Sequence, residues 1–299
     1  MKQNTKAHIA LIATNIFFAL NYTAVKTLFN GGFVKPFGLN FIRVIVATAL
    51  LWLLYLFAAD KKKIDKKHYG RFFLCSILGI SLNQLLFIKG LSLTSSIHAS
   101  LLILTTPILI TFIAAWILKE KLTANKILGL LLGVCGAMVL ILARDNTGNA
   151  QNVIWGDILI LLNAISYTFY FVLVKPLIKE YNSIMVLRVI FTIGLVMLLP
   201  FCSGELVEIQ WQIFGAKEFI LLASITLLGT FCAYLFNIYG IKVLGASTAG
   251  SYIYSQPLFA AIIAIGLLGE TIALYKIIAA VLIFAGVFLA NKKINEQHN

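Results

Sequence analysis

Charged residues are scarce in this 299-residue chain. Only 12% of the residues are Asp, Glu, Lys or Arg, against about a quarter in a typical soluble domain, and 61% are hydrophobic. A soluble globule of this length could not hide so much apolar surface from water. We therefore exclude a soluble fold and expect an all-α integral membrane protein. A β-barrel is excluded as well, because its strands alternate in polarity at every second residue and the apolar segments here do not.

The sequence also lacks the motifs of a membrane-embedded enzyme. It contains no His-Glu-x-x-His, no Gly-x-Ser-x-Gly and no Walker-type loop, so hydrolysis and ATP-driven pumping lack their chemistry. We expect no enzymatic activity, no cofactor and no metal. The net charge of +13 does not indicate nucleic acid, because the basic residues lie between apolar segments and not on one folded face. The few cysteines lie in or beside apolar segments, where a thiol behaves as a small buried hydrophobe: Cys75, Cys135, Cys202 and Cys232.

Apolar segments long enough to cross a membrane divide the chain. A bilayer core of about 30 Å takes about 20 residues in a helix. The connections are mostly a few residues long, so we expect no sizeable domain outside the lipid bilayer. The expected spans are 8–29, 36–58, 70–91, 95–118, 124–143, 155–174, 182–202, 218–240, 245–268 and 273–291.

Basic residues are distributed unevenly between the two sides of this arrangement. The loops on the side of the N-terminus hold most of them, including the lysine-rich run 61–67, whereas the other side holds few. Because cytoplasmic loops carry the excess of Lys and Arg, we expect both termini in the cytoplasm.

The second half of the chain repeats the first. A shift of 150 residues needs no gap over four of the predicted spans, and it superposes Gly79 on Gly229, Gly90 on Gly240, Ala99 on Ala249, Pro107 on Pro257, Glu120 on Glu270 and Gly136 on Gly286. We therefore divide the chain into two repeats, residues 1–147 and 148–299, with five helices in each. Because five is odd, the second repeat crosses the membrane in the opposite sense. Such inverted repeats are common among secondary transporters.

Both repeats carry one motif, in which a mid-helix proline is followed by Leu-x-Glu and then by a glycine in the next apolar helix. It reads Pro107…Leu118-Lys119-Glu120…Gly136 and then Pro257…Leu268-Gly269-Glu270…Gly286. This pattern resembles the EamA-type branch of the drug/metabolite transporter superfamily, and the resemblance covers essentially the whole chain. It implies two five-helix repeats around a central cavity. It also implies export or exchange of amino acids and related small metabolites across a bacterial-type inner (plasma) membrane.

Pro107 and Pro257 are predicted to break their helices near the bilayer midplane. Proline lacks the N–H and crowds the carbonyl group four residues earlier, which here belongs to Ile103 or Ile253. Carbonyl groups freed inside a membrane need a polar partner or a water-lined cavity. We interpret the two prolines as hinge candidates, because both occupy the same position in the repeat. A kink that serves packing alone is the alternative.

Polar side chains share helix faces at spacings of three, four and seven residues. They make a candidate substrate cavity, and hydrogen bonding between helices is the alternative. The last helix of each repeat has no such stripe, so we expect it at the periphery. There we expect Gly129 and Gly133 to serve close packing within a monomer and not dimerisation. The cavity candidates are Asn21, Gln84, His98, Thr105, Asn163, Tyr167, Tyr170, Tyr234, Asn237, Tyr252, Ser255 and Gln256.

Arg43 and Arg188 lie inside predicted spans, where a charge costs at least about 2.5 kcal/mol and usually has a partner. They act either as structural anchors or as substrate contacts. All acidic residues fall in loops or at span ends, and Asp157 is the closest to a span interior. A cavity without a carboxylate cannot neutralise a permanent organic cation. We therefore predict that the small-molecule substrate is zwitterionic, neutral or anionic.

Energy coupling and the class of function follow from the same residues. Without a carboxylate inside the membrane, a proton would have to move through His98 or through a group on the substrate. We therefore favour facilitated diffusion or exchange over proton coupling. A secondary transporter that works by alternating access needs a central cavity and two gates, whereas a membrane receptor or scaffold needs neither. The paired helix breaks favour the transporter, and a receptor or scaffold is the alternative.

Overall fold

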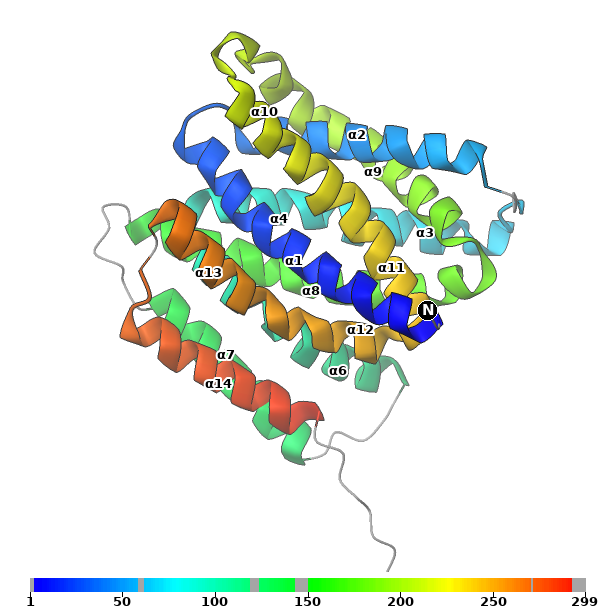
Figure 1. Ribbon diagram of the computed structural model, residues 1–299. Helices are drawn as coiled ribbons and strands as arrows, with labels where there is room; N and C mark the ends of the chain where they lie inside the picture. Colours follow the sequence, from blue (N-terminus) through cyan, green and yellow to red (C-terminus); the bar gives the residue numbers. More distant parts are fainter. Residues whose placement is uncertain (1–2, 59–61, 119–123, 143–149, 270, 292–299) are drawn as a thin grey trace, which may run out of the picture.

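The computed structural model describes residues 3–58, 62–118, 124–142, 150–269 and 271–291, and over these residues it consists of helices and short connections without a strand (Figure 1). The motif residues Glu120 and Glu270 lie outside the described residues. Within them, several helical stretches are long and apolar enough to cross a membrane: Gln3–Asn30, Pro36–Leu56, Lys66–Leu93, Asn152–Glu180, Ser183–Val207, Ala216–Leu244 and Thr248–Leu268. Shorter apolar helices cover Ser96–Leu109, Ile127–Val139 and Leu274–Gly286. The prediction of an all-α membrane protein is confirmed.

The first half of the chain begins with two long helices, α1 (Gln3–Asn30) and α2 (Pro36–Leu56). A third stretch joins the 3₁₀ turn η1 (Lys66–His68), α3 (Tyr69–Ser76), the π-helical segment η2 (Ile77–Ser81) and α4 (Leu82–Leu93). The fourth is divided into α5 (Ser96–Ile103) and α6 (Thr105–Leu118), and α7 (Ala124–Leu142) ends this half.

The second half has the same order of elements. It begins with α8 (Ala150–Glu180) and α9 (Ser183–Val207), and the short turn η3 (Trp211–Ile213) follows. A stretch of α10 (Ala216–Ala223), π-helical η4 (Ser224–Cys232) and α11 (Ala233–Leu244) comes next. The last stretches are α12 (Ala246–Ser251), the 3₁₀ turn η5 (Tyr252–Ser255) and α13 (Gln256–Leu268), and then α14 (Leu274–Asn291).

The irregular segments occur at equivalent positions of the two halves. The shift of 150 residues moves the π-helical Ile77–Ser81 onto 227–231, inside the π-helical Ser224–Cys232. The same shift moves Leu104, which lies between α5 and α6, onto Tyr254 in the 3₁₀ turn before α13. Pro107 is the third residue of α6 and Pro257 is the second residue of α13, so both lie in the first turn after the interruption. Local distortions that recur at one offset support the internal repeat.

Helix packing follows the repeat as well. The most extensive contacts join α7 with α14, α2 with α9, α4 with α8, and α1 with α11. Each pair takes one helix from each half. The bundle has two ends. The first end, on the left in Figure 1, is the one at which the helices α2, α5, α8, α10 and α14 start. The second end is the one at which α1, α3, α7, α9 and α12 start.

Small residues bring α7 and α14 close together at the edge of the bundle (Figure 1). A Cβ atom on Gly286 would lie 2.5 Å from the carbonyl oxygen of Gly129 and 2.8 Å from the backbone nitrogen of Gly133. A Cβ atom on Gly136 would lie 2.9 Å from the carbonyl oxygen of Ala279. Gly129 and Gly133 thus serve close packing within the chain.

The start of α2 is fixed by a carboxylate from α9. Pro36 suits the first helical turn, because its missing N–H would have no partner there. The Glu205 carboxylate accepts hydrogen bonds from the backbone N–H groups of Phe37 at 2.6 Å and Gly38 at 3.0 Å. In the connection before α2, an ion pair and hydrogen bond with Glu208 raises the pKa of Lys35. These contacts join the two halves at the first end.

Candidate functional site

A cavity of about 70 Å³ lies among helices of both halves. At about 30 Å³ per molecule, it has room for only a few water molecules. Most of its lining is polar or aromatic, and the two isoleucines, Ile103 and Ile253, are the residues four positions before the prolines. The lining residues are Phe18, Asn21, Tyr22, Arg43, Asn83, Gln84, Phe87, Ile103, Asn163, Tyr167, Tyr234, Ile253 and Gln256.

Amide side chains hold the middle of this cavity in place. The Gln84 amide donates a hydrogen bond of 2.9 Å to the hydroxyl of Tyr234, which donates in turn to the Gly79 carbonyl oxygen at 3.0 Å. Asn83 and Asn163 form a reciprocal pair, in which each amide donates to the other residue's backbone carbonyl group, at 3.2 and 2.8 Å. Both contacts cross between the halves, so the cavity lies on the interface of the two repeats.

A second chain of hydrogen bonds joins α1 to the start of α13. The Tyr22 hydroxyl donates to the Gln256 side-chain oxygen at 3.2 Å, and the Gln256 amide donates to the Asn15 oxygen at 2.7 Å. Gln256 directly precedes Pro257. The lining is therefore connected to the interruption before α13.

Arg43 supplies the formal charge of the cavity. The residue is 2% exposed, its Nε donates to the Thr230 hydroxyl at 3.0 Å, and its guanidinium lies 5.9 Å from the centre of the Phe87 ring. One of its terminal nitrogens, NH1, is buried without a hydrogen-bond partner. The lining contains no Asp or Glu side chain. Burial of a guanidinium without a counterion is costly.

Arg188 has a different environment, although it occupies a similar position in the sequence of the second repeat. Its guanidinium stacks on Tyr55 at 3.8 Å and on Trp52 at 4.4 Å from the ring centres. It does not line the cavity. These cation–π contacts are those of an anchor between α9 and α2.

The cavity contains only part of the candidate set predicted from helix faces. Asn21, Gln84, Asn163, Tyr167, Tyr234 and Gln256 line it. Asn237 stands behind the lining, where it donates to the Tyr167 hydroxyl at 2.6 Å. The remaining candidates lie elsewhere, and they are His98, Thr105, Tyr170, Tyr252 and Ser255.

Local contacts explain these positions. The hydroxyls of Thr105 and Ser255 each donate to the backbone carbonyl group three residues earlier, at 2.7 and 2.8 Å. Tyr170 packs its ring against Gly79. The Tyr252 hydroxyl lies 2.6 Å from Nδ1 of His8 near the second end.

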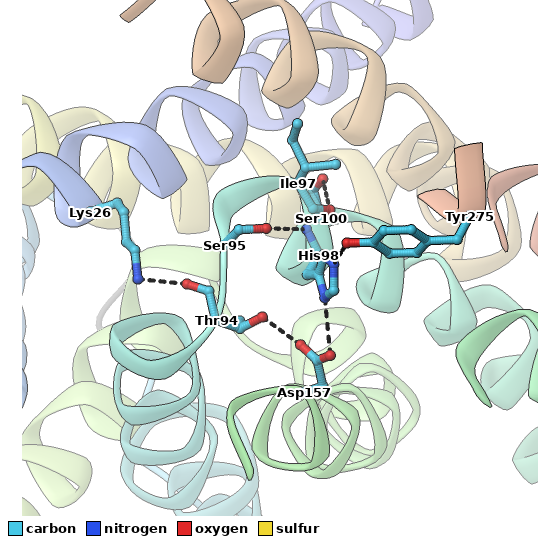
Figure 2. Close-up of polar contacts among 8 residues, drawn as sticks. All are labelled: Lys26, Thr94, Ser95, Ile97, His98, Ser100, Asp157 and Tyr275. Carbon is cyan, nitrogen blue, oxygen red and sulfur yellow. Dashed lines mark hydrogen bonds and ion pairs between the residues drawn. The ribbon is translucent and has the colours of Figure 1, made fainter. Parts of the chain in front are cut away.

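His98 belongs to a separate polar cluster at the first end (Figure 2). Its Nδ1 lies 3.0 Å from an oxygen of Asp157, and its Nε2 lies 3.1 Å from the Tyr275 hydroxyl. The Thr94 hydroxyl donates to the other Asp157 oxygen at 2.5 Å. Thr94 also accepts a hydrogen bond of 2.6 Å from Lys26 at its backbone oxygen.

Asp157 lies farther from the start of its helix than expected, although it is still near the first end. The helix α8 begins at Ala150 and not at 155, so Asp157 lies two turns inside the helix and is fully buried. Helix α8 also extends past its expected end at 174, through Pro176 to Glu180, and α9 extends past its expected end at 202 to Val207.

Sequence patterns missed several lining residues. Asn83 directly precedes Gln84, but its aligned position in the second repeat is Ala233, so the repeat gave no signal for it. Tyr22 directly follows the candidate Asn21. The only sequence feature that indicated a role for Arg43 was its position inside an apolar span. Arg188 has the same feature, so the sequence could not show which of the two arginines lines the cavity.

Comparisons with known proteins agree with this architecture. A model described as the EamA-like transporter family matches residues 5–142 and again 154–292. An uncharacterized transporter of Archaeoglobus fulgidus is 25% identical over 97% of this chain and 99% of its own length. The uncharacterized transporter YyaM of Bacillus subtilis is 26% identical over 95% of this chain and 93% of its own. One solved crystal structure has the same fold, with a TM-score of 0.62 at 16% identity over 94% of this chain and 96% of that chain.

Proposed function

Because the chain belongs to the EamA-like transporter family, we propose that it carries small metabolites with an anionic group, most simply the carboxylate of an amino acid or a related compound. The substrate binds in the central cavity, with its anionic group on Arg43. The membrane is a bacterial-type inner (plasma) membrane with both chain termini in the cytoplasm. The direction is export or exchange, without ATP.

The observation that carries this proposal is the unpartnered nitrogen of Arg43. The guanidinium is buried, NH1 has no hydrogen-bond partner, and no lining residue is acidic. A charge in such surroundings gains most from a bound anion. A carboxylate supplies that anion and accepts two parallel hydrogen bonds from a guanidinium.

The remainder of the lining suits a zwitterion. The side-chain oxygen of Asn21 is buried without a hydrogen-bond partner, and the hydroxyls of Tyr22 and Tyr167 stand nearby in the lining. Such oxygens accept hydrogen bonds from a substrate ammonium group. A permanent cation finds no carboxylate here and meets the charge of Arg43, so it is disfavoured.

Transport by alternating access fits the two interrupted helices. We assign one repeat to residues 1–147 and the inverted second repeat to 148–299. The cavity holds only a few water molecules, so a metabolite enters after the helices separate. Pro107 and Pro257 follow the two interruptions and are suited to act as hinges. A receptor or scaffold needs neither feature.

The proposal is tested by ligand binding to the purified protein. We would measure thermal stabilisation by panels of amino acids, other carboxylates, neutral amides and quaternary amines. We expect stabilisation by at least one compound that carries a carboxylate. A hydrogen bond to a charged group is worth about 1.5–3 kcal/mol, so Arg43→Gln should weaken that binding by about 10- to 150-fold.

Arg188→Gln is the matched control, because it removes an intramembrane guanidinium that does not line the cavity. It should leave the dissociation constant within a factor of about two, since it removes no cavity contact. Stabilisation by quaternary amines alone, or equal losses in the two variants, would contradict the assignment of Arg43.

A further inference from the structure

The polar cluster at the first end is buried as completely as the core. Asp157 is 0% exposed, His98 is 1% exposed and Thr94 is 2% exposed, and none of the three lines the central cavity. An isolated carboxylate so deeply buried would cost several kcal/mol, whereas an imidazole that carries a proton compensates for it. The cavity assigned to the substrate does not need this pair, so the pair calls for an explanation of its own.

We propose that His98 and Asp157 form a proton-binding site, which holds one proton at His98 Nε2 while the first end is closed and exchanges it with water when that end opens. The transported metabolite has no part in this site. It is a second ligand site of the chain, and its ligand is the proton.

The geometry accommodates the imidazole with and without the added proton. The Asp157 carboxylate can only accept, so Nδ1 of His98 carries a hydrogen in both forms. Nε2 faces the Tyr275 hydroxyl at 3.1 Å. This hydroxyl donates to a neutral Nε2 and accepts from a protonated one. One proton can therefore be added or removed without breaking either contact.

The cluster joins helices of the two halves at the first end. His98 lies on α5, in the half of its helix that precedes the Pro107 interruption, whereas Asp157 and Tyr275 lie on α8 and α14 of the second half (Figure 2). Thr94, at the end of α4, ties the same carboxylate to the first half at 2.5 Å. An opening of the first end that moves α5 away from α8 would separate His98 from Asp157.

The charged side chains that the structure describes around α5 have contacts of their own. Lys26 on α1 donates to the backbone oxygens of Leu91, Ser92 and Thr94, at 3.2, 3.3 and 2.6 Å. Lys276 on α14 donates to the Thr271 oxygen at 3.0 Å. Lys89 on α4 is exposed, and the described parts of α6 and α13, which also pack on α5, contain no charged residue. Among the described side chains, the Asp157 carboxylate and the Tyr275 hydroxyl contact the His98 ring.

The sign of the pH effect follows from the charge of the pair. With a neutral imidazole, closing the first end buries the net negative charge of Asp157, and with an imidazolium it buries a neutral ion pair. Low pH therefore favours the closed first end and slows the transport cycle. We expect flux at pH 5.5 to be at least about threefold below flux at pH 7.5.

Proton binding can be measured without any substrate. The chain has four histidines, so a ¹⁵N-histidine-labelled sample of the full chain gives few signals. We expect Nε2 of His98 to change from an acceptor to a protonated nitrogen as the pH falls from 8 to 5. His98→Gln assigns the signal. If that variant does not fold, elimination with His8→Gln, His68→Gln and His298→Gln assigns it. A His98 signal that stays in one form over this range overturns the proposal.

The coupling between proton binding at His98 and opening of the first end is measured by flux in proteoliposomes. Of the two experiments, only this one rests on the proposed transport function. His98→Gln should remove the pH dependence, and Asp157→Asn should flatten it as well. His68→Gln is the matched control, because His68 makes a similar contact of 2.9 Å with Tyr181 at the second end. It should keep the wild-type profile. An unchanged profile in His98→Gln overturns the proposal, whereas an absence of any flux contradicts only the transport assignment.

Discussion

Adding one methyl group at Gly286 should weaken the contact between α7 and α14. In Gly286→Ala the new Cβ would lie 2.5 Å from the Gly129 carbonyl oxygen and 2.8 Å from the Gly133 nitrogen. Both are backbone atoms, so α7 must move by about 1 Å to restore a contact of about 3.5 Å. Overpacking of this kind costs about 1–3 kcal/mol.

Helix propensity opposes this loss and has to be measured separately. Replacing Gly by Ala in a helix gains up to about 1 kcal/mol. Gly266→Ala isolates that gain, because a Cβ at Gly266 meets no atom within 4 Å. At about 2–4 °C per kcal/mol, Gly286→Ala should melt about 2–12 °C below Gly266→Ala. Thermal unfolding of the two purified proteins in the same detergent measures the difference, and equal melting temperatures would refute the packing argument.

Further predictions concern the hinges and the cavity network. Pro107→Ala and Pro257→Ala should each slow transport severalfold at near-normal thermal stability. Because the repeats are inverted, the two variants should bias opposite facing states, and cysteine labelling from each side measures this bias. Undiminished flux in both variants would contradict the prediction. Tyr234→Phe leaves the Gln84 amide and the Gly79 carbonyl group each without one hydrogen-bond partner. It should therefore lower the free energy of unfolding by about 1–3 kcal/mol. An unchanged denaturation midpoint would count against this hydrogen-bond network.

The overall architecture could be predicted from the sequence because the second half of the chain repeats the first. The shift that aligns Pro107 with Pro257 also aligns the helix interruptions, and the shift that aligns Gly136 with Gly286 aligns the close contacts of α7 and α14. No residue pattern predicted the π-helical segments, which have no composition of their own. Helix ends were predicted least well, as the early start of α8 shows.

The candidate site was only partly accessible, for two physical reasons. A polar stripe at helical spacing fixes a face but not the contacts on it, so Tyr167 and Tyr170 could not be told apart, although only Tyr167 lines the cavity. Small hydroxyl residues such as Thr105 donate to a backbone carbonyl group a few residues earlier in the chain. The contact between His98 and Asp157 joins residues on two helices that are 59 positions apart in the sequence. The helical periodicity of a sequence gives no information about such contacts.

The central claim is that Arg43 binds the anionic group of a transported metabolite. The most direct measurement is counterflow of radiolabelled solutes into proteoliposomes that hold the wild-type chain, Arg43→Gln or Arg188→Gln. We predict saturable uptake of at least one carboxylate-bearing or zwitterionic metabolite by the wild type and by Arg188→Gln, and an apparent affinity at least tenfold weaker in Arg43→Gln. Uptake of permanent organic cations that survives in Arg43→Gln, or no counterflow of any solute by the wild type, would contradict the account.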